Sequence, residues 1–428
     1  MNSESSHRSN ATLVLFTKQY PYGHAETYLN NEIRFLDEAF KEVILVPVDA
    51  YKFGDVNPIV SGLRNTRVFK INESKKAVGF SKRILRTLQC LRVLLNEILN
   101  GREPWMHIRK LRFCLTYLKV GYGQAENLHD FIGDKSGHVV LYSYWLQKGT
   151  IAGIFYKRYF NIASKLVNRA HSSDLYHRDW NSIIQMESAP FYPFEYFKVS
   201  ESDHVYAISD HGVAHLQRVF PYFSDRFSVA RLAVKDSGKL NPFSNTNLFR
   251  IVTCSGITPN KRVYFIPQIL HLLKDLPVEW VHLGEGKGQN LEVLQSEIDK
   301  YEVQDRITIK GRMDNAEIFR YYENEQVNLI MNLSKAEGIP VSLMEAISFG
   351  IPGIVTNTVG NPEVIDETCG YIVEVDFEPE HIVDLIKGMY RNRELQNELR
   401  TCARHMFERR YHAEKNYAQF VEELKSYE

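Results

Sequence analysis

The sequence has no apolar run as long as the ~20 residues that a membrane-spanning helix needs. Its first ten residues are polar and lack the apolar centre of a signal peptide. The five cysteines are odd in number and show no CxxC spacing, which argues against a disulfide framework. From these absences we expect a cytoplasmic protein with reduced thiols, either free or peripheral on the cytoplasmic face of a membrane.

Net charge is absent as well, since 52 Lys and Arg balance 52 Asp and Glu. The chain has 44% hydrophobic and 24% charged residues, which is typical of a globular protein, and its 428 residues suffice for two domains. No cluster of His and acidic residues has the spacing of metal ligands, so we predict no metal site.

Short apolar runs alternate with helical patterns along the whole chain, which predicts α/β architecture. Near the start, a helix from about Ala25 would bury Leu29, Ile33, Leu36 and Phe40 on one face. A segment rich in Asn, Ser, Pro and Gly, 235–247, predicts a linker between two such domains. Strands are predicted at 11–16, 43–48, 139–145, 163–170, 204–209, 227–233, 251–254, 280–283, 307–309, 327–331, 354–355 and 371–373.

The stretch 334–365 carries the clearest chemical signal. The apolar run 327–331 predicts a strand, followed by a loop with Glu337 and a helix that contains Glu345. Pro340 suits the first helical turn, where its missing donor costs nothing. Ligands bind at the carboxyl ends of strands in open α/β sheets, so Glu337 would face such a site.

The start of this helix offers a place for a phosphate. We expect free amides near Val341, Ser342 and Leu343, at the positive end of the helix dipole. The carboxylate of Glu345 would accept hydrogen bonds from a diol such as a ribose. The spacing alone is equally compatible with an amphipathic helix that carries two ordinary acids.

The letters EGIPVSLMEA and FGIPGIVTNTVGNPEVI resemble the donor site of retaining glycosyltransferases of the GT-B fold, family four in the sequence classification. The resemblance implies an acceptor-binding Rossmann-like domain at 1–234, a nucleotide-sugar-binding one at 248–405, and a cleft between them. It also implies that helix 406–428 crosses back to the first domain. Donor contacts are implied for Glu337 and Glu345, and for the intervening residues Gly338, Ile339, Pro340, Val341 and Ser342.

Other segments extend the resemblance. The opening loop of the family is similar to the segment YPYGHAETYLNNEI, in which Gly23 would approach the donor phosphates. His171, three residues before Asp174, matches a histidine that holds the donor sugar in the family. Lys261 in SGITPNKR matches a diphosphate-binding lysine. Arg312 and Met313 fall where the backbone meets the nucleotide base.

One position departs from the family pattern. Where the family has a second diphosphate-binding cation, five residues before Lys261, this chain has Gly256. Loss of one charged hydrogen bond costs about 1.5–3 kcal/mol unless another group replaces it. Arg262 and Lys287 are the candidates for that replacement.

A basic stretch at 64–119 contains fourteen Lys or Arg and only three acids, among leucines and aromatic residues. Such helices suit an anionic membrane surface, where each cation contributes about 1 kcal/mol. A solvated helix pair is the alternative. Nucleic acid is disfavoured because no nucleic-acid motif accompanies the charge.

The resemblance therefore predicts a retaining, metal-independent hexosyltransferase. It would use a UDP- or GDP-linked sugar and no other cofactor, and would extend a glycan, lipid-linked by expectation, in surface polysaccharide biosynthesis. A nucleotide-sugar epimerase or a phosphorylase of the same fold is the alternative enzyme. A catalytically silent scaffold is the alternative from another class.

Overall fold

The structure is a computed structural model, and it describes residues 8–23, 26–49, 55–69, 80–100, 108–133, 138–176, 192–244 and 247–428. Its chain divides into two compact units. Within the described ranges, unit 1 contains 8–176, 192–230 and 417–428, and unit 2 contains 231–416.

Unit 1 is built on a parallel sheet of seven strands in the order β3-β2-β1-β4-β5-β6-β7. In its centre Leu13 pairs with Val43 on one side and Val140 on the other. Such strands are covered on both faces, and this is why they form continuous apolar runs in the sequence. The strands are β1 (Ser9–Thr17), β2 (Phe40–Pro47), β3 (Thr66–Val68), β4 (Val139–Ser143), β5 (Lys165–Ala170), β6 (His204–Ala207) and β7 (Phe227–Val229).

The strand predictions for this unit are confirmed, except that β3 was not predicted and β7 ends four residues early. Leu29, Ile33, Leu36 and Phe40 are fully buried, as expected, although Phe40 already belongs to β2. The predicted start of the first helix at Ala25 lies outside the described residues. The chain instead forms the 3-10 helix η1 (Thr27–Asn31) and then α1 (Ile33–Ala39).

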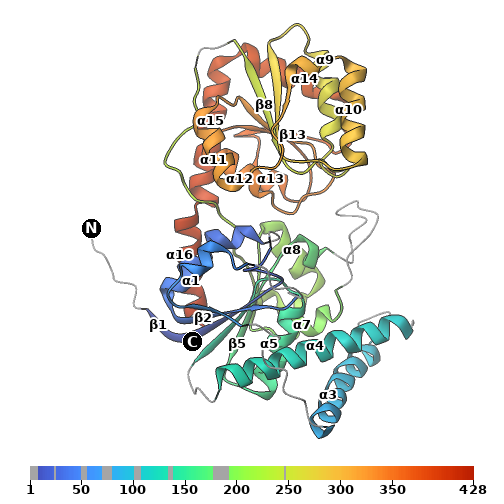
Figure 1. Ribbon diagram of the computed structural model, residues 1–428, viewed down its shortest axis with the longest axis vertical. Coiled ribbons are helices and arrows are strands. Elements are labelled where there is room, and N and C mark those ends of the chain that lie inside the picture. Colours follow the sequence, from blue (N-terminus) through green and yellow to red (C-terminus); the bar gives the residue numbers. More distant parts are fainter. Residues whose placement is uncertain are drawn as a thin grey trace. The chain divides into compact units, whose positions relative to one another are not determined.

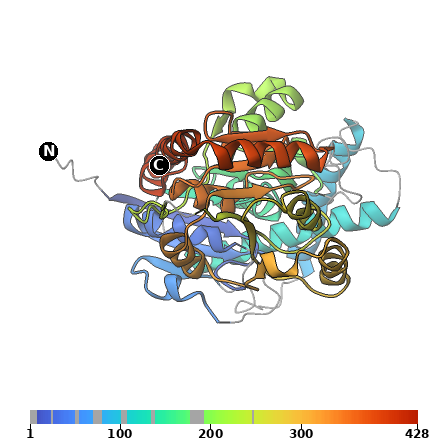
Figure 2. The same ribbon diagram turned by 90° about the horizontal axis from the view of Figure 1, so that it is seen from above.

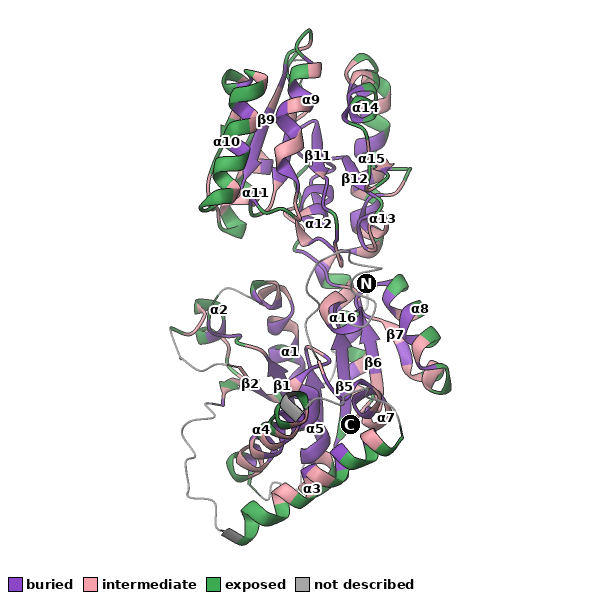
Figure 3. Cartoon of the chain, turned by 90° about the vertical axis from the view of Figure 1, so that its right-hand side faces the viewer, coloured by how far each residue is buried: buried purple, intermediate pink, exposed green. Residues whose placement is uncertain are grey.

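Two long helices, α3 (Phe80–Leu99) and α4 (Ile108–Ile132), pack against each other beside the unit 1 sheet (Figure 1). The outer side of α3 is exposed along its length (Figure 3). Residues 70–79 and 101–107 of the basic stretch lie outside the described residues. The other helices are α2 (Pro58–Ser61), α5 (Lys148–Tyr159), α6 (Ser172–Leu175), α7 (Glu195–Glu201), α8 (Asp210–Val219) and η4 (Pro221–Arg226).

Unit 2 has a parallel sheet of six strands in the order β10-β9-β8-β11-β12-β13. The strand order reverses between β8 and β11, and ligands bind beyond the carboxyl ends of strands at such a switch point. The predicted strands are all present. They are β8 (Phe249–Cys254), β9 (Val278–Leu283), β10 (Ile307–Ile309), β11 (Leu329–Asn332), β12 (Gly353–Thr356) and β13 (Gly370–Val373).

Helices cover both faces of this second sheet (Figures 1 and 2). None of the described helices combines the length and apolarity needed to span a bilayer. The helices of unit 2 are η5 (Val263–Phe265), α9 (Ile266–Leu272), α10 (Gln289–Tyr301), η6 (Gln304–Arg306), α11 (Asn315–Asn324), α12 (Val341–Ser348), α13 (Asn361–Val364), α14 (Pro379–Arg391), α15 (Arg393–Arg410) and the first turn of α16 (Ala413–Lys425).

The end of α16 belongs to unit 1, where Phe420 packs over the guanidinium of Arg169 and against Tyr142. Arg169 forms a fully buried ion pair with Glu32. Part of the predicted linker is packed into unit 2, since Asn241 is buried and donates to the carbonyls of Tyr322 and Glu325.

Candidate functional site

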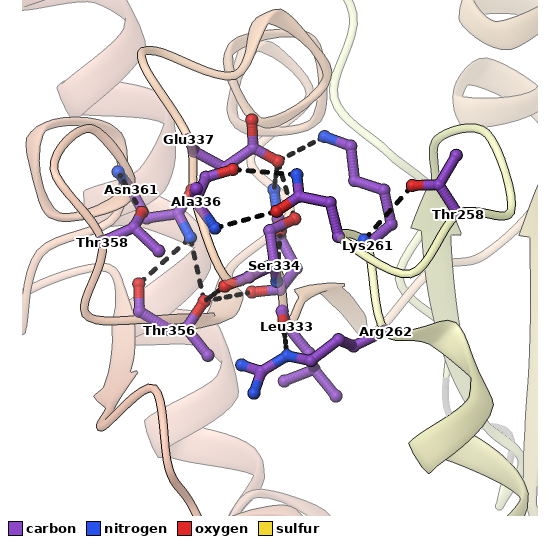
Figure 4. Close-up of polar contacts among 12 residues, drawn as sticks. Thr258, Lys261, Arg262, Leu333, Ser334, Ala336, Glu337, Thr356, Thr358 and Asn361 are labelled. Atoms are coloured by element: carbon purple, nitrogen blue, oxygen red, sulfur yellow. Dashed lines mark hydrogen bonds and ion pairs between the residues drawn. The ribbon is translucent and has the colours of Figure 1, made fainter. Parts of the chain in front are cut away.

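The centre of the candidate site is formed by the two loops that follow β8 and β11, the neighbouring strands at the switch point of unit 2. Lys261 lies in the first loop and Glu337 in the second. The Nζ atom of Lys261 pairs with Oε1 of Glu337, although the two residues are 76 positions apart (Figure 4). The side chains are 26% and 12% exposed, so a ligand can reach both of them.

The Glu337 carboxylate is held by more than the lysine. Its Oε1 atom also accepts from Ser334 Oγ at 2.7 Å and from Asn332 Nδ2 at 3.4 Å. All three donors meet the same oxygen, and no hydrogen bond to Oε2 occurs within the described residues. The carboxylate therefore has one fixed oxygen and one available to a ligand.

The helix after Glu337 begins one residue later than predicted. Pro340 is extended and caps α12, which starts at Val341. The amides of Val341 and Ser342 have no protein acceptor in the described chain, but the amide of Leu343 donates to the Pro340 carbonyl at 3.1 Å. The expectation of a free amide at Leu343 was therefore wrong.

These amides lie next to the ion pair. A small pocket reaches from the Lys261 loop to the start of α12, with Lys261, Asn332, Ser342 and Leu343 among its lining residues. Two free amides, the positive end of a helix dipole and an ammonium group form an arrangement suited to a diphosphate.

Glu345 lies on α12 and is only 7% exposed. Burial raises its pKa to about 8, against the opposing effect of a hydrogen bond from Asn315 Nδ2 at 2.5 Å. At neutral pH this group is a neutral acid with one O–H donor. It can therefore both donate to and accept from a diol, whereas the sequence suggested an acceptor only.

The remaining donor-site candidates of unit 2 differ in exposure. Arg312 is exposed and Met313 is half-buried, both directly after Gly311, which pairs with Gly284. Ile339 is buried. A Cβ placed on Gly360 would lie 1.3 Å from the carbonyl oxygen of Gly338, so the backbone of Gly338 is packed tightly against the loop before α13.

The structure does not identify Arg262 or Lys287 as the replacement for the diphosphate-binding cation that the family has at the position of Gly256. Arg262 is buried, and it donates to the carbonyls of Leu333 at 2.6 Å and Val375 at 2.7 Å. Two of its nitrogens are therefore used within the unit, while its Nη2 atom is buried without a hydrogen-bond partner among the described residues. Lys287 is 81% exposed and pairs with Glu285 at 3.3 Å.

In unit 1, His171 follows β5 and precedes α6. Its ring lies 4.2 Å from that of Trp145 and 5.0 Å from that of Tyr144. Burial, together with the nearby charge of Arg169, holds the pKa of His171 well below its usual value. Its Nε2 atom is buried and has no hydrogen-bond partner in the described part of the chain.

The opening loop of unit 1 is held by Glu26, a residue that sequence reasoning missed. Its carboxylate accepts from the amides of Lys18, Gln19 and Tyr20, at 2.7 to 3.0 Å, and from the indole of Trp145 at 2.6 Å. Gly23 is exposed in this loop with φ of 69°, a conformation that favours glycine.

Four further residues with site contacts were not predicted as site residues: Asn260, Asn315, Asn332 and Ser334. Ser334, three residues before Glu337, had a signal in the sequence. Asn260 and Asn315 meet the site through contacts between distant segments.

The chain is similar to known proteins in sequence and in fold. Residues 241–406 match the family model described as Glycosyl transferases group 1. The chain is 25% identical over 201 residues to the UDP-N-acetylglucosamine–peptide N-acetylglucosaminyltransferase GtfA subunit of Streptococcus gordonii, covering 46% of this chain and 38% of that protein. It is 26% identical over 157 residues to the putative colanic acid biosynthesis glycosyltransferase WcaL of Escherichia coli K12, covering 35% of this chain and 38% of that protein. The matches thus span about two fifths of each relative.

A solved structure aligns over a longer stretch. The crystal structure of Anabaena Alr3699/HepE in complex with UDP superposes with a TM-score of 0.67 and 14% sequence identity, and covers 97% of this chain and 100% of that chain. Together with the two parallel sheets, this likeness confirms the predicted GT-B fold.

Proposed function

Because residues 241–406 form a glycosyl transferases group 1 domain within a chain of GT-B fold, we propose that this protein is a retaining glycosyltransferase. It transfers a hexosyl group from a nucleotide sugar to a glycan acceptor in surface polysaccharide biosynthesis. The observation that carries the proposal is the pairing of Lys261 with Glu337 beside the free amides of α12. The pair lies at the switch point of an open parallel sheet, where such folds bind nucleotides.

The mechanism is electrostatic. As the bond between the anomeric carbon and the diphosphate breaks, Lys261 and the amides of Val341 and Ser342 stabilise the negative charge that grows on the leaving group. The acceptor hydroxyl forms its bond to the anomeric carbon on the same face, and its proton passes to a departing diphosphate oxygen. Glu337 accepts hydrogen bonds from the sugar hydroxyls, and no metal is required by this scheme.

Another residue positions the substrate. Neutral Glu345 exchanges hydrogen bonds with the ribose diol. The likeness to a structure that holds UDP makes UDP-sugars the first donors to test, with GDP-sugars second. The relative named for colanic acid biosynthesis supports a polysaccharide acceptor.

The proposal extends to a lipid-linked acceptor at an anionic membrane surface on the cytoplasmic face. Ile84, Leu88, Leu95 and Leu99 recur at helical spacing on α3 and are all exposed, with Leu99 82% exposed. Exposed Arg92 lies beside this row. An apolar row flanked by cations matches the acyl boundary and headgroups of an anionic leaflet.

The central test is transfer activity with UDP- and GDP-sugars. We expect Lys261→Ala and Glu337→Ala each to lower kcat about 100- to 1,000-fold, as loss of one preorganised group does. Lys274→Ala, which removes an exposed lysine of the same unit, should leave the rate unchanged. Unchanged turnover in both site variants would refute the proposal, and consumption of the nucleotide sugar without a glycoside product would favour the epimerase.

A further inference from the structure

Asn260 links the two loops that carry the ion pair. Its Nδ2 donates to the Ala336 carbonyl at 3.0 Å, and its Oδ1 accepts from the Ala336 amide at 3.1 Å. Its own backbone carbonyl accepts from the Lys335 amide at 2.9 Å. Three hydrogen bonds thus join a single residue of one loop to two successive residues of the other.

These bonds lie directly beside the ion pair in the sequence. Asn260 immediately precedes Lys261, and Ala336 immediately precedes Glu337. A side-chain amide that donates to the carbonyl and accepts from the N–H of the same residue fixes distance and orientation together, because neither bond can swing without straining the other. The lysine and the acid are therefore held in register through their own neighbours.

We propose that Asn260 is a positioning residue, which sets the diphosphate-binding loop against the sugar-binding loop. This inference rests on the proposed function. The nucleoside diphosphate and the sugar of one donor must be held at a fixed separation, and the three bonds of Asn260 provide it. A displacement of about 1 Å in such a site can lower a rate about 100-fold.

The Glu337 loop is also held by contacts that do not involve Asn260. Thr356 Oγ1 donates to the carbonyl of Ser334 at 2.6 Å, and Arg262 anchors the carbonyl of Leu333 (Figure 4). Gly360 packs against Gly338 from the other side. Since these contacts remain when Asn260 is replaced, the loop should stay ordered while its register with Lys261 loosens.

The variants Asn260→Ala and Asn260→Asp separate the parts of this contact. Alanine removes both side-chain bonds. Aspartate keeps the acceptor for the Ala336 amide but places an oxygen against the Ala336 carbonyl, where no donor is left. The matched control is Asn324→Asp, because Asn324 is exposed on α11 and donates only to the Arg320 carbonyl of its own helix.

The experiment measures kcat and KM with the nucleotide sugar that the wild type consumes, affinity for UDP or GDP by calorimetry, and Tm. We expect both Asn260 variants to lose about 10- to 100-fold in kcat, while affinity for the nucleoside diphosphate and Tm stay close to wild type. The control should match the wild type throughout.

Two results would overturn the inference while leaving the proposed function intact. One is a wild-type kcat in both variants. The other is a decrease of Tm and nucleotide affinity together with kcat, which would show that Asn260 is only a structural residue. A wild-type protein that transfers no sugar from any UDP or GDP donor would overturn the proposed function itself, and the role of Asn260 with it.

Discussion

At the scale of single residues, the burial of Glu345 makes a prediction about pH. Its folded-state pKa of about 8 lies above the ordinary value of 4.5, because ionisation inside the unit is unfavourable. The folded state therefore retains a proton that the unfolded state has lost, and stability falls as pH rises between about 4.5 and 8. Above that window the contribution is constant.

We expect Glu345→Gln to remove this dependence, since glutamine can keep the hydrogen bond from Asn315 and cannot ionise. The free energy of unfolding in urea is measured for both proteins at pH 5, 7 and 9. The value for the variant minus that for the wild type should rise by a few kcal/mol from pH 5 to pH 9. Glu398→Gln, on the exposed side of α15, is the control. A constant difference across the series would mean that Glu345 titrates normally.

Gly360 supports a second prediction, about packing. The substitution Gly360→Ala places a methyl group on the Gly338 carbonyl and must displace the loop of Glu337. Activity should fall at least tenfold, because reacting groups tolerate little displacement. Gly388→Ala, in the interior of α14 with no atom within 4 Å of the new Cβ, should stabilise the protein by about 0.5–1 kcal/mol and leave the rate alone. Equal activity in the two variants would contradict this reading.

Residue identities and residue contacts differed in how well they could be predicted. Lys261, Glu337 and Glu345 were predicted as site residues from the family resemblance of their segments. Their partners were not, because Asn260 meets Ala336, and Asn315 meets Glu345, across 76 and 30 positions of sequence. Periodicity records which face of an element is buried, but not which distant side chain meets it.

At the scale of elements, the exposed row on α3 predicts binding to anionic vesicles. We expect the protein to float with vesicles rich in phosphatidylglycerol and to remain unbound with phosphatidylcholine. Leu95→Glu should abolish flotation, because it places a charge in the apolar row. Ile162→Glu, at an 86% exposed apolar site elsewhere in unit 1, is the matched control. Failure to float with either vesicle would leave α3 as half of a solvated helix pair.

Element boundaries show where tertiary contacts overrode local pattern. The local pattern of residues 261–273 predicts one helix, but the structure has a turn, then η5, and α9 only from Ile266. The break occurs at Arg262, whose φ of 50° is rare for a side-chain-bearing residue. Its guanidinium hydrogen bonds to Leu333 and Val375 hold it there, and these come from segments that no local window contains.

At the scale of the whole molecule, ligand binding should be visible as stability. A nucleoside diphosphate present at a hundred times its Kd raises the free energy of unfolding by about 2.7 kcal/mol, because it binds only the folded state. For a unit of this size that corresponds to a rise in Tm of about 5–10 °C. We expect thermal unfolding to show this rise with UDP or GDP, and Lys261→Ala to lose most of it. No shift with either nucleotide would favour a silent scaffold over an enzyme.

The alternation of apolar runs fixed the α/β class of this chain, because a buried parallel strand must be apolar on both faces. The family resemblance supplied the candidate residues, whose groups suit phosphate and sugar chemistry near a strand end. Only the tertiary structure decided that Lys261 and Glu337 pair, that Asn260 joins their loops, and that Arg262 turns inward. These depend on strand order, which brings β8 beside β11 across 74 residues of intervening chain.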